Sequence, residues 1–363
     1  MKKLLITTDS FLPRWDGVAR FLDEVIPRLR KYYKITVIAP NYGGVKYKGI
    51  KLIKFSLARF RISGYRPAKP NLGLIKKFVE DTDLIFNQTP GPIGVLTVLY
   101  ANKIKKPVIS YAHSIEWELF PEAVYIPSLF KKRIKTTTKK LARLIYNKCS
   151  LILVASDDVA QKLKRNKIKA KTKVVKLGLS KEFIPGNTKK KFNLDDKIVI
   201  GYCGRLSREK NLETLLKAFN KLKYEKKFLL IVGDGPYRKL FIKNKRIKLV
   251  KNAKDIVKYL QAMDIFVMPS LTETSSLATL EAMRCGLPIL CTKVGYMMHY
   301  IKDGFNGYFI PKKSSSYLAK ILIKLIKNKK LRAKLGKNAR RSVAKLNWGY
   351  TAKGLMKEFK RFI

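Results

Sequence analysis

Acidic residues are scarce in this chain of 363 residues: 25 Asp and Glu stand against 79 Lys and Arg, a formal net charge of +54 at pH 7. The basic excess is spread over both halves of the chain rather than collected in a tail. A field of this size favours anionic partners, such as membrane headgroups, nucleic acid or phosphorylated small molecules. A general lysine bias, as in a thermophile, explains the composition equally well.

Cysteine, histidine and long apolar runs are also scarce. The four cysteines contain no C-x-x-C pair, so we expect buried thiols in a reduced, cytoplasmic protein. The N-terminal "MKKLLITTDSF" has an apolar run of only three residues, too short for a signal peptide. No stretch approaches the ~18 uninterrupted apolar residues of a spanning helix, so membrane contact, if any, is peripheral.

Short apolar runs alternate with amphipathic stretches along the chain, which indicates parallel sheets covered on both faces by helices. The predicted strands include 3–8, 34–40, 83–88, 107–113, 150–156, 197–204, 228–235, 264–270 and 288–293. The polar, Pro-Gly-containing segment 181–196 interrupts this rhythm and is predicted to link a domain of residues 1–180 to one of residues 197–345. In doubly wound domains of this kind, ligands bind at the carboxyl ends of the strands.

Two of these strand ends carry residues suited to a phosphorylated ligand. In "GYCGRLSREKNLETLLKAF" (201–219), Arg205 and Lys210 precede a helix for which Asn211 is the expected N-cap. Two cations beside a helix N-terminus suit a diphosphate, although both are also ordinary surface residues in so basic a chain. In "LLIVGDGPYRKL" (229–240), the Gly-Pro turn fits either a plain connection or close approach of a ligand.

A third strand end, "SLTETSSLATLEAMRCGLP" (270–288), holds two carboxylates. We expect a loop with Glu273, then a short helix from about residue 276 to 284 that lacks a capping box and leaves its first amides available to a ligand. Glu281 lies among apolar residues of this helix and needs hydrogen-bond donors there. Ribose hydroxyls would serve, as would an ion pair with Arg284.

The order of "GRLSREKN", "VGDGP", "MPSLTETSSLATLEAMRCGLP" and "IKDGFNGYFI" resembles that of the retaining glycosyltransferases of family four, which have the GT-B fold. The N-terminal "TTDSFLPRWDGVARFLDEVIPRL" and "PVISYAHS" are also similar to these enzymes, especially to members that transfer mannose or glucose to membrane lipids. The resemblance covers nearly the whole chain. It implies an α/β protein of two doubly wound Rossmann-like domains facing a cleft, with a C-terminal helix (346–363) that returns to the N-terminal domain.

The resemblance also implies roles for individual residues. Arg205 and Lys210 would neutralise the diphosphate of a nucleotide-sugar, and the amides at Gly17 would reach its distal phosphate. Glu281 would bind the ribose. The residues expected beside the hexose are His113 and Glu273 as catalytic groups, with backbone contacts from Thr274, Ser275, Ser276 and Leu277. His299 is interpreted as structural.

The chain departs from the family pattern at two places. Asp16 and Ser275–Ser276 stand where many members have glycine and Phe-Gly or Gln-Gly, respectively. No Asp-x-Asp motif stands where a metal-dependent enzyme would need it, so we expect no metal and no cofactor. The predicted reaction moves a hexose from a UDP- or GDP-linked donor to an acceptor hydroxyl with retention, the donor phosphate taking the acceptor proton on the same face.

Two basic segments indicate what kind of acceptor the enzyme uses. "KFSLARFRISGYRPAKPN" (54–71) interleaves aromatic and basic residues, and "LFKKRIKTTTKKLARLIYNK" (129–148) is predicted as a basic helix with Ile134, Leu141 and Ile145 on one face. Both suit an anionic membrane surface, although the helix also fits an ordinary crossover with a solvated charged face.

We therefore expect a peripheral enzyme on the inner face of the cell membrane that glycosylates a lipid. A soluble sugar or polysaccharide acceptor is the alternative, and an epimerase of the same architecture is a further one. A nucleic-acid-binding protein would explain the charge but not the two glutamates, and the chain has no zinc-finger spacing or RNP-like motif, so no nucleic-acid partner is expected.

Overall fold

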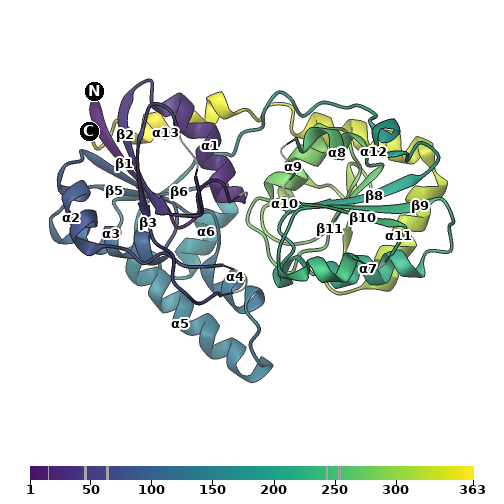
Figure 1. Ribbon diagram of the computed structural model, residues 1–363, viewed down its shortest axis with the longest axis horizontal. Helices are drawn as coiled ribbons and strands as arrows, with labels where there is room; N and C mark the ends of the chain where they lie inside the picture. The colour runs from purple at the N-terminus through teal and green to yellow at the C-terminus, as the bar shows by residue number, and fades with distance from the viewer. Residues whose placement is uncertain (15, 45–46, 63–64, 243, 252, 254) are drawn as a thin grey trace. The chain divides into compact units, whose positions relative to one another are not determined.

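The computed structural model describes residues 1–14, 16–44, 47–62, 65–242, 244–251, 253 and 255–363. The chain divides into two compact units (Figure 1). Unit 1 consists of Met1–Gly178 together with Asn347–Ile363, and unit 2 consists of Leu179–Leu346. Each unit has its own parallel sheet and its own apolar core.

Unit 1 contains a seven-stranded sheet in the order β3-β2-β1-β4-β5-β6-β7, with parallel pairing throughout. Its central strands β4, β5 and β6 are buried along their whole length, as expected for strands covered on both faces. The strands are β1 (Lys2–Thr7), β2 (Tyr33–Pro40), β3 (Lys51–Phe55), β4 (Leu84–Asn87), β5 (Val108–Tyr111), β6 (Leu151–Val154) and β7 (Thr172–Val174).

The helices of unit 1 complete its two outer layers. Helix α1 contacts α13, whereas α3 contacts both α2 and α5 (Figure 1). The helices are α1 (Gly17–Leu29), α2 (Leu72–Glu80), α3 (Pro92–Lys103), α4 (Glu116–Ala123), α5 (Ser128–Tyr146), α6 (Asp157–Arg165) and α13 (Trp348–Phe359).

Helix α13 joins the C-terminus of the chain to the N-terminal domain, as the resemblance implied. The ring of Phe359 lies 5.0 Å from that of Phe86 in β4, and Thr351 Oγ1 donates to the carbonyl of Lys176 at 2.9 Å. Apolar burial and this hydrogen bond hold the last helix on the sheet of unit 1.

Unit 2 contains a six-stranded parallel sheet in the order β10-β9-β8-β11-β12-β13. The strands are β8 (Ile198–Cys203), β9 (Lys227–Val232), β10 (Ile247–Val250), β11 (Ile265–Met268), β12 (Ile289–Thr292) and β13 (Gly307–Ile310). The helices are α7 (Leu212–Lys221), α8 (Val257–Gln261), α9 (Leu277–Arg284), α10 (Met297–Tyr300), α11 (Ser315–Lys327) and α12 (Lys329–Ser342), with short 3-10 turns η1 (Lys189–Phe192), η2 (Arg208–Lys210) and η3 (Pro236–Phe241).

The segment 181–196, which the sequence suggested as a linker, is part of unit 2 in the structure. It contains the turn η1, and Phe183 and Leu194 are buried in the core of that unit. Burial of these two large apolar side chains stabilises the position of the segment on unit 2.

Helix α5 differs from the amphipathic helix that the sequence predicted. Ile145 is 1 % exposed, but Leu141 on the same expected face is 49 % exposed. Residues 129–141 include no buried side chain, because the first half of α5 projects from the rest of unit 1 (Figure 1). The last turns of the helix are buried in the core of the unit, whereas the first half is contacted by α4, where Lys131 Nζ lies 3.3 Å from the carboxylate of Glu122.

Candidate active site

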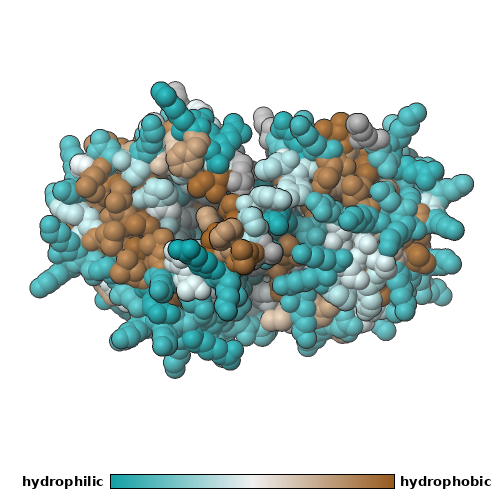
Figure 2. Space-filling model, turned by 90° about the horizontal axis from the view of Figure 1, so that it is seen from below, coloured by the Kyte–Doolittle hydropathy of each residue, from teal (hydrophilic) through white to brown (hydrophobic). Residues whose placement is uncertain are grey.

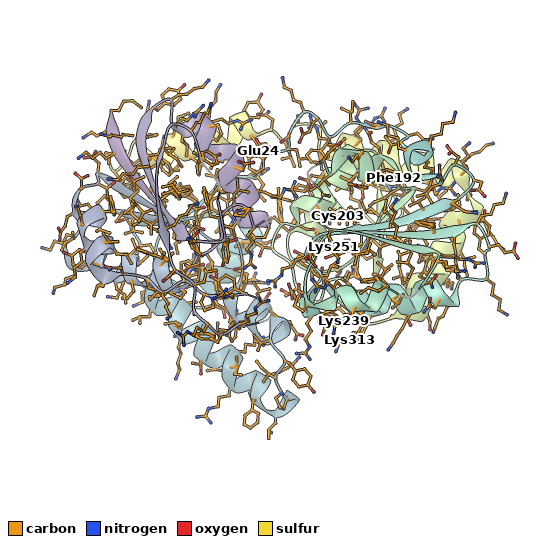
Figure 3. The ribbon with its side chains drawn as sticks, in the orientation of Figure 1. Glu24, Phe192, Cys203, Lys239, Lys251 and Lys313 are labelled. Atoms are coloured by element: carbon orange, nitrogen blue, oxygen red, sulfur yellow. The ribbon has the colours of Figure 1, made fainter. Side chains whose placement is uncertain are left out.

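The basic and acidic residues singled out in unit 2 come from two adjacent strands. Strand β8, whose end is marked by Cys203 in Figure 3, pairs with β11, and both strands run in the same direction. Arg205 and Lys210 follow β8, and Glu273 follows β11. The parallel sheet therefore brings these charges to one edge, where ligands bind in doubly wound domains.

Lys210 and Glu273 form an ion pair across 63 residues of sequence. Lys210 Nζ lies 2.5 Å from Glu273 Oε1, and the same oxygen accepts a hydrogen bond from Ser270 Oγ at 2.8 Å. The two side chains are 19 % and 9 % exposed, so the pair is largely shielded from water. Glu273 thus holds the ammonium group of Lys210 at the carboxyl end of the sheet.

Arg205 is held by a second carboxylate that sequence reasoning missed. Arg205 Nη2 donates to Glu209 Oε1 at 2.9 Å, and Ser207 Oγ donates to the same oxygen at 2.5 Å. Burial opposes ionisation of Glu209, but Arg205 and Lys210 outweigh it and lower the pKa of this carboxyl. The only sequence signal was the i, i+4 spacing of Arg205 and Glu209.

The loop and helix that follow β11 provide polar groups at the carboxyl end of that strand. Ser276, the N-cap of α9, has φ 41° and makes no side-chain bond to the amides of the first turn; its Oγ lies 2.8 Å from Thr279 Oγ1. The Oγ of Ser275 is buried, and no hydrogen-bond partner is found for it among the residues that the structure describes. The start of α9 therefore retains hydrogen-bonding capacity for an anionic or hydroxylated ligand.

Glu281 lies in the middle of α9 and is 2 % exposed. The contacts recorded for Arg284 are with backbone: its Nη1 donates to the carbonyls of Ala344 and Leu346 at 3.4 and 3.2 Å. Thr274 and Leu277, also expected beside the ligand, are 9 % and 8 % exposed at the start of this helix. All of these expected residues lie in unit 2 with Arg205 and Lys210.

Two features near β8 serve packing. A Cβ on Gly233 would lie 1.9 Å from the carbonyl oxygen of Gly204, and one on Gly235 would lie 2.3 Å from that of Leu206. The glycines after β9 therefore allow two loops to pack together. Asn211 is the N-cap of α7, as predicted, but its side chain donates to the carbonyl of Pro269 at 3.1 Å instead of capping the helix.

His113 follows β5 in unit 1 and packs against two aromatic rings. Its ring lies 4.8 Å from that of Phe21 and 4.6 Å from that of Tyr111, and its Nε2 is 3.0 Å from Gln88 Oε1. Burial lowers the pKa of His113 to about 3, although the Asp16 carboxylate acts in the opposite direction. The imidazole is therefore neutral at physiological pH.

Gly17 begins α1 in unit 1, but the backbone amides of the next two residues already donate hydrogen bonds within the protein. Asp16 is the N-cap, and its Oδ1 accepts from the amides of Val18 and Ala19 at 3.1 Å each. Arg14 Nε lies 2.9 Å from Asp16 Oδ2, which also accepts from Ser10 Oγ. A phosphate at this helix end would therefore meet the carboxylate that stands in the family's glycine position.

Two features are absent from the residues that the structure describes. Among them, no group of three or more His, Cys, Asp and Glu side chains is placed to hold a metal ion. None of the helices described is both long and apolar enough to cross a membrane.

The fold and these residues define a class: two parallel α/β units with the GT-B architecture of glycosyltransferases. The family model "Glycosyltransferase Family 4" matches residues 15–183, and "Glycosyl transferases group 1" matches residues 186–342. The two models together span most of the chain, which belongs to the glycosyltransferases of family four.

Curated relatives and a solved structure agree with this assignment. The chain is 23 % identical to the uncharacterized glycosyltransferase MJ1178 of Methanocaldococcus jannaschii, over 96 % of this chain and 95 % of the relative. It is 25 % identical to the alpha-monoglucosyldiacylglycerol synthase of Acholeplasma laidlawii, over 92 % and 90 %. The crystal structure of Anabaena HepE in complex with UDP-glucose superposes with a TM-score of 0.79 at 19 % identity, covering 99 % of this chain and all of the other.

Proposed function

We propose that this protein transfers a hexose from a UDP- or GDP-linked donor to the hydroxyl of a membrane lipid, with retention at the anomeric carbon and without a metal ion. The proposed binding of the nucleotide-sugar donor rests on the Lys210–Glu273 pair, which lies with Arg205 and the uncapped start of α9 in unit 2. Fixed cations and amides at one sheet edge stabilise a departing diphosphate without reorganising.

The residues of unit 2 divide this work. Arg205 and Lys210 neutralise the diphosphate as the bond from the anomeric carbon to its oxygen breaks, which replaces a divalent cation. Glu209 and Glu273 keep the two cations in place. Glu281 accepts hydrogen bonds from the ribose, and backbone groups of 274–277 contact the phosphate and the sugar.

Retention follows when the acceptor attacks from the face that the phosphate leaves. The acceptor oxygen bonds to the anomeric carbon, and its proton passes to the departing phosphate oxygen. Gly17 supplies an amide to the distal phosphate and His113 contacts the transferred sugar. The neutral imidazole of His113 fits such a contact, since a hydroxyl is an uncharged partner.

A surface at the junction of α4 and α5 supports a lipid acceptor. Tyr125 and Leu129 are 87 % and 82 % exposed, and Phe120 and Phe130 are 40 % and 48 % exposed. We call these four residues, with Lys132, Arg133 and Lys140 of α5, the α4–α5 surface. Figure 2 shows hydrophobic residues gathered among hydrophilic ones on the side of unit 1 from which α5 projects. Exposed apolar side chains next to cations fit the interface of an anionic membrane.

The donor site is tested by thermal shift with UDP, GDP and ADP, on wild type and on Glu281→Gln. A ligand that binds the folded state raises the melting temperature, and the shift grows with the logarithm of the ratio of ligand concentration to Kd. We expect one nucleotide to stabilise wild type and to lose most of that effect in Glu281→Gln. Equal shifts in both proteins would show that the ribose assignment is wrong.

The membrane half is tested by co-sedimentation with phosphatidylglycerol vesicles at low and high salt. We expect Leu129→Ser/Phe130→Ser to release the protein, with Ile242→Ser/Tyr350→Ser as the control for equally exposed apolar residues elsewhere. Lys132→Gln/Arg133→Gln/Lys140→Gln should weaken binding more than Lys329→Gln/Lys330→Gln/Lys334→Gln on α12, which removes the same charge. Binding that tracks net charge alone would refute this surface and favour a soluble acceptor.

A further inference from the structure

Gln88 occupies a fixed position next to His113. It is the first residue after β4, the strand between β1 and β5, and is 1 % exposed. Its amide N donates to the carbonyl of Thr7 at 2.9 Å, which ties its backbone to the end of β1. Its side-chain Nε2 donates to the carbonyl of Phe86 at 3.3 Å, so its Oε1 faces the imidazole.

This arrangement decides which imidazole nitrogen carries the proton. An amide oxygen only accepts hydrogen bonds, so the His113 Nε2 that lies 3.0 Å from it must donate. The opposite orientation of the amide would bring Gln88 Oε1 against the Phe86 carbonyl, two acceptors facing each other. A neutral imidazole protonated at Nε2 has a lone pair at Nδ1.

We infer that Gln88 is a positioning residue that fixes His113 in its Nε2-protonated tautomer, so that Nδ1 accepts a hydrogen bond from a hydroxyl of the transferred sugar. The inference rests on the proposed function for the identity of that hydroxyl. The tautomer itself follows from the geometry of unit 1.

The surroundings of His113 keep this acceptor in place. The edge contact with Phe21 and the tilted contact with Tyr111 restrict the ring, and burial keeps it neutral well below pH 7. Of the charged groups near it, Asp16 favours the protonated ring, and Arg14 lies 2.9 Å from the carboxylate of Asp16. An acceptor held at Nδ1 favours a donor sugar that places a hydroxyl at this point.

Selective ¹⁵N-histidine NMR tests the tautomer directly, because the chain has only two histidines. His299→Gln assigns the spectrum. Wild type should show a protonated Nε2 and an unprotonated Nδ1 for His113, unchanged between pH 5 and 8. A protonated Nδ1, or an imidazolium at pH 7, would overturn the inference.

Variants at Gln88 test the cause. Gln88→Met removes the acceptor and should give a mixture of tautomers, whereas Gln88→Glu keeps an acceptor and should retain the Nε2–H signal. Gln261→Met is the control for the same change at a glutamine of unit 2, and should leave the His113 signals untouched. An unchanged spectrum in folded Gln88→Met would show that another group sets the tautomer.

The sugar contact has its own readout. Addition of UDP-glucose or GDP-mannose should shift the Nδ1 resonance, and the matching nucleotide without sugar should not. We expect kcat/KM of Gln88→Met to fall by about 2-fold from the tautomer population alone, and by about 10-fold if the ring also loses its orientation. If a nucleotide-sugar stabilises the protein without moving Nδ1, the sugar contact is refuted while the donor site stands; if neither stabilises it, the proposed function fails.

Discussion

Removal of the Lys210 ammonium group should lower both the free energy of unfolding and the activity. Removal of its partner charge on Glu273 as well should restore the free energy of unfolding but not the activity. Lys210→Met leaves Glu273, whose side chain is 9 % exposed, without its cation, while the Ser270 hydroxyl still donates to it. Breaking a buried pair on one side costs about 3–5 kcal/mol. Because Lys210 is 19 % exposed and Ser270 remains, we expect a loss of about 2–4 kcal/mol.

The double variant Lys210→Met/Glu273→Gln removes both charges and should recover to within about 1 kcal/mol of wild type. Its hexosyl transfer should remain at least about 100-fold reduced in kcat/KM, since the diphosphate has lost a cation. Glu273→Gln alone should cost less stability than Lys210→Met, because the more exposed lysine can be hydrated.

Urea unfolding followed by far-UV circular dichroism measures this cycle. Unit 2 contains no tryptophan, whereas Trp117 and Trp348 belong to unit 1, so tryptophan fluorescence serves as an internal control. The circular dichroism transition should move in Lys210→Met and return in the double variant. A double variant as unstable as the single one would refute the ion-pair reasoning, and full activity in it would refute the role of Lys210.

Three further predictions concern single residues. Asp16→Asn keeps the N-cap of α1 and removes the negative charge that faces the proposed phosphate. Titration calorimetry should therefore show about three- to tenfold tighter binding of the nucleoside diphosphate. Weaker binding would contradict the Gly17 contact. Burial raises the pKa of Glu116 from 4.5 to about 7, although hydrogen bonds from Tyr146 and Ser114 act in the opposite direction. The contribution of Glu116 to the free energy of unfolding is therefore full below pH 4.5 and is lost as the pH rises to about 7. The free energy of unfolding of Glu116→Gln should lack this pH dependence. Ser276 has φ 41°, where glycine is favoured, so Ser276→Gly should raise the free energy of unfolding by about 0.5–1 kcal/mol, and a loss would show that the hydroxyl contact with Thr279 outweighs the strain.

The interior strands of both sheets were predictable and the edge strands were not. The runs from 3–8 to 288–293 correspond to β1, β2, β4, β5, β6, β8, β9, β11 and β12. The strands at the sheet edges are β3, β7, β10 and β13, and all four are partly exposed. An edge strand needs no continuous apolar run, so hydrophobic patterning does not reveal it.

Residue types of the candidate site were predictable, and their pairings were not. As predicted from the sequence, a helix starts at its N-cap Ser276, Glu273 lies in the loop before it and Glu281 lies within it. Lys210 pairs with Glu273 because β8 and β11 are neighbours in the sheet. No local sequence pattern predicts that strand order. The role of Gln88 was equally hidden, because it depends on the order β1-β4-β5.

The most direct test of the proposed function is hexose transfer to lipid. Purified protein is incubated with radiolabelled UDP-glucose or GDP-mannose and phosphatidylglycerol vesicles that contain diacylglycerol, and the extracted lipid is counted and its anomeric configuration determined by NMR. We predict an α-linked product with one of the two donors, and little or none with Glu281→Gln. No label in lipid from either donor, with transfer to soluble sugars instead, would contradict the lipid acceptor, and a β-linked product would contradict retention.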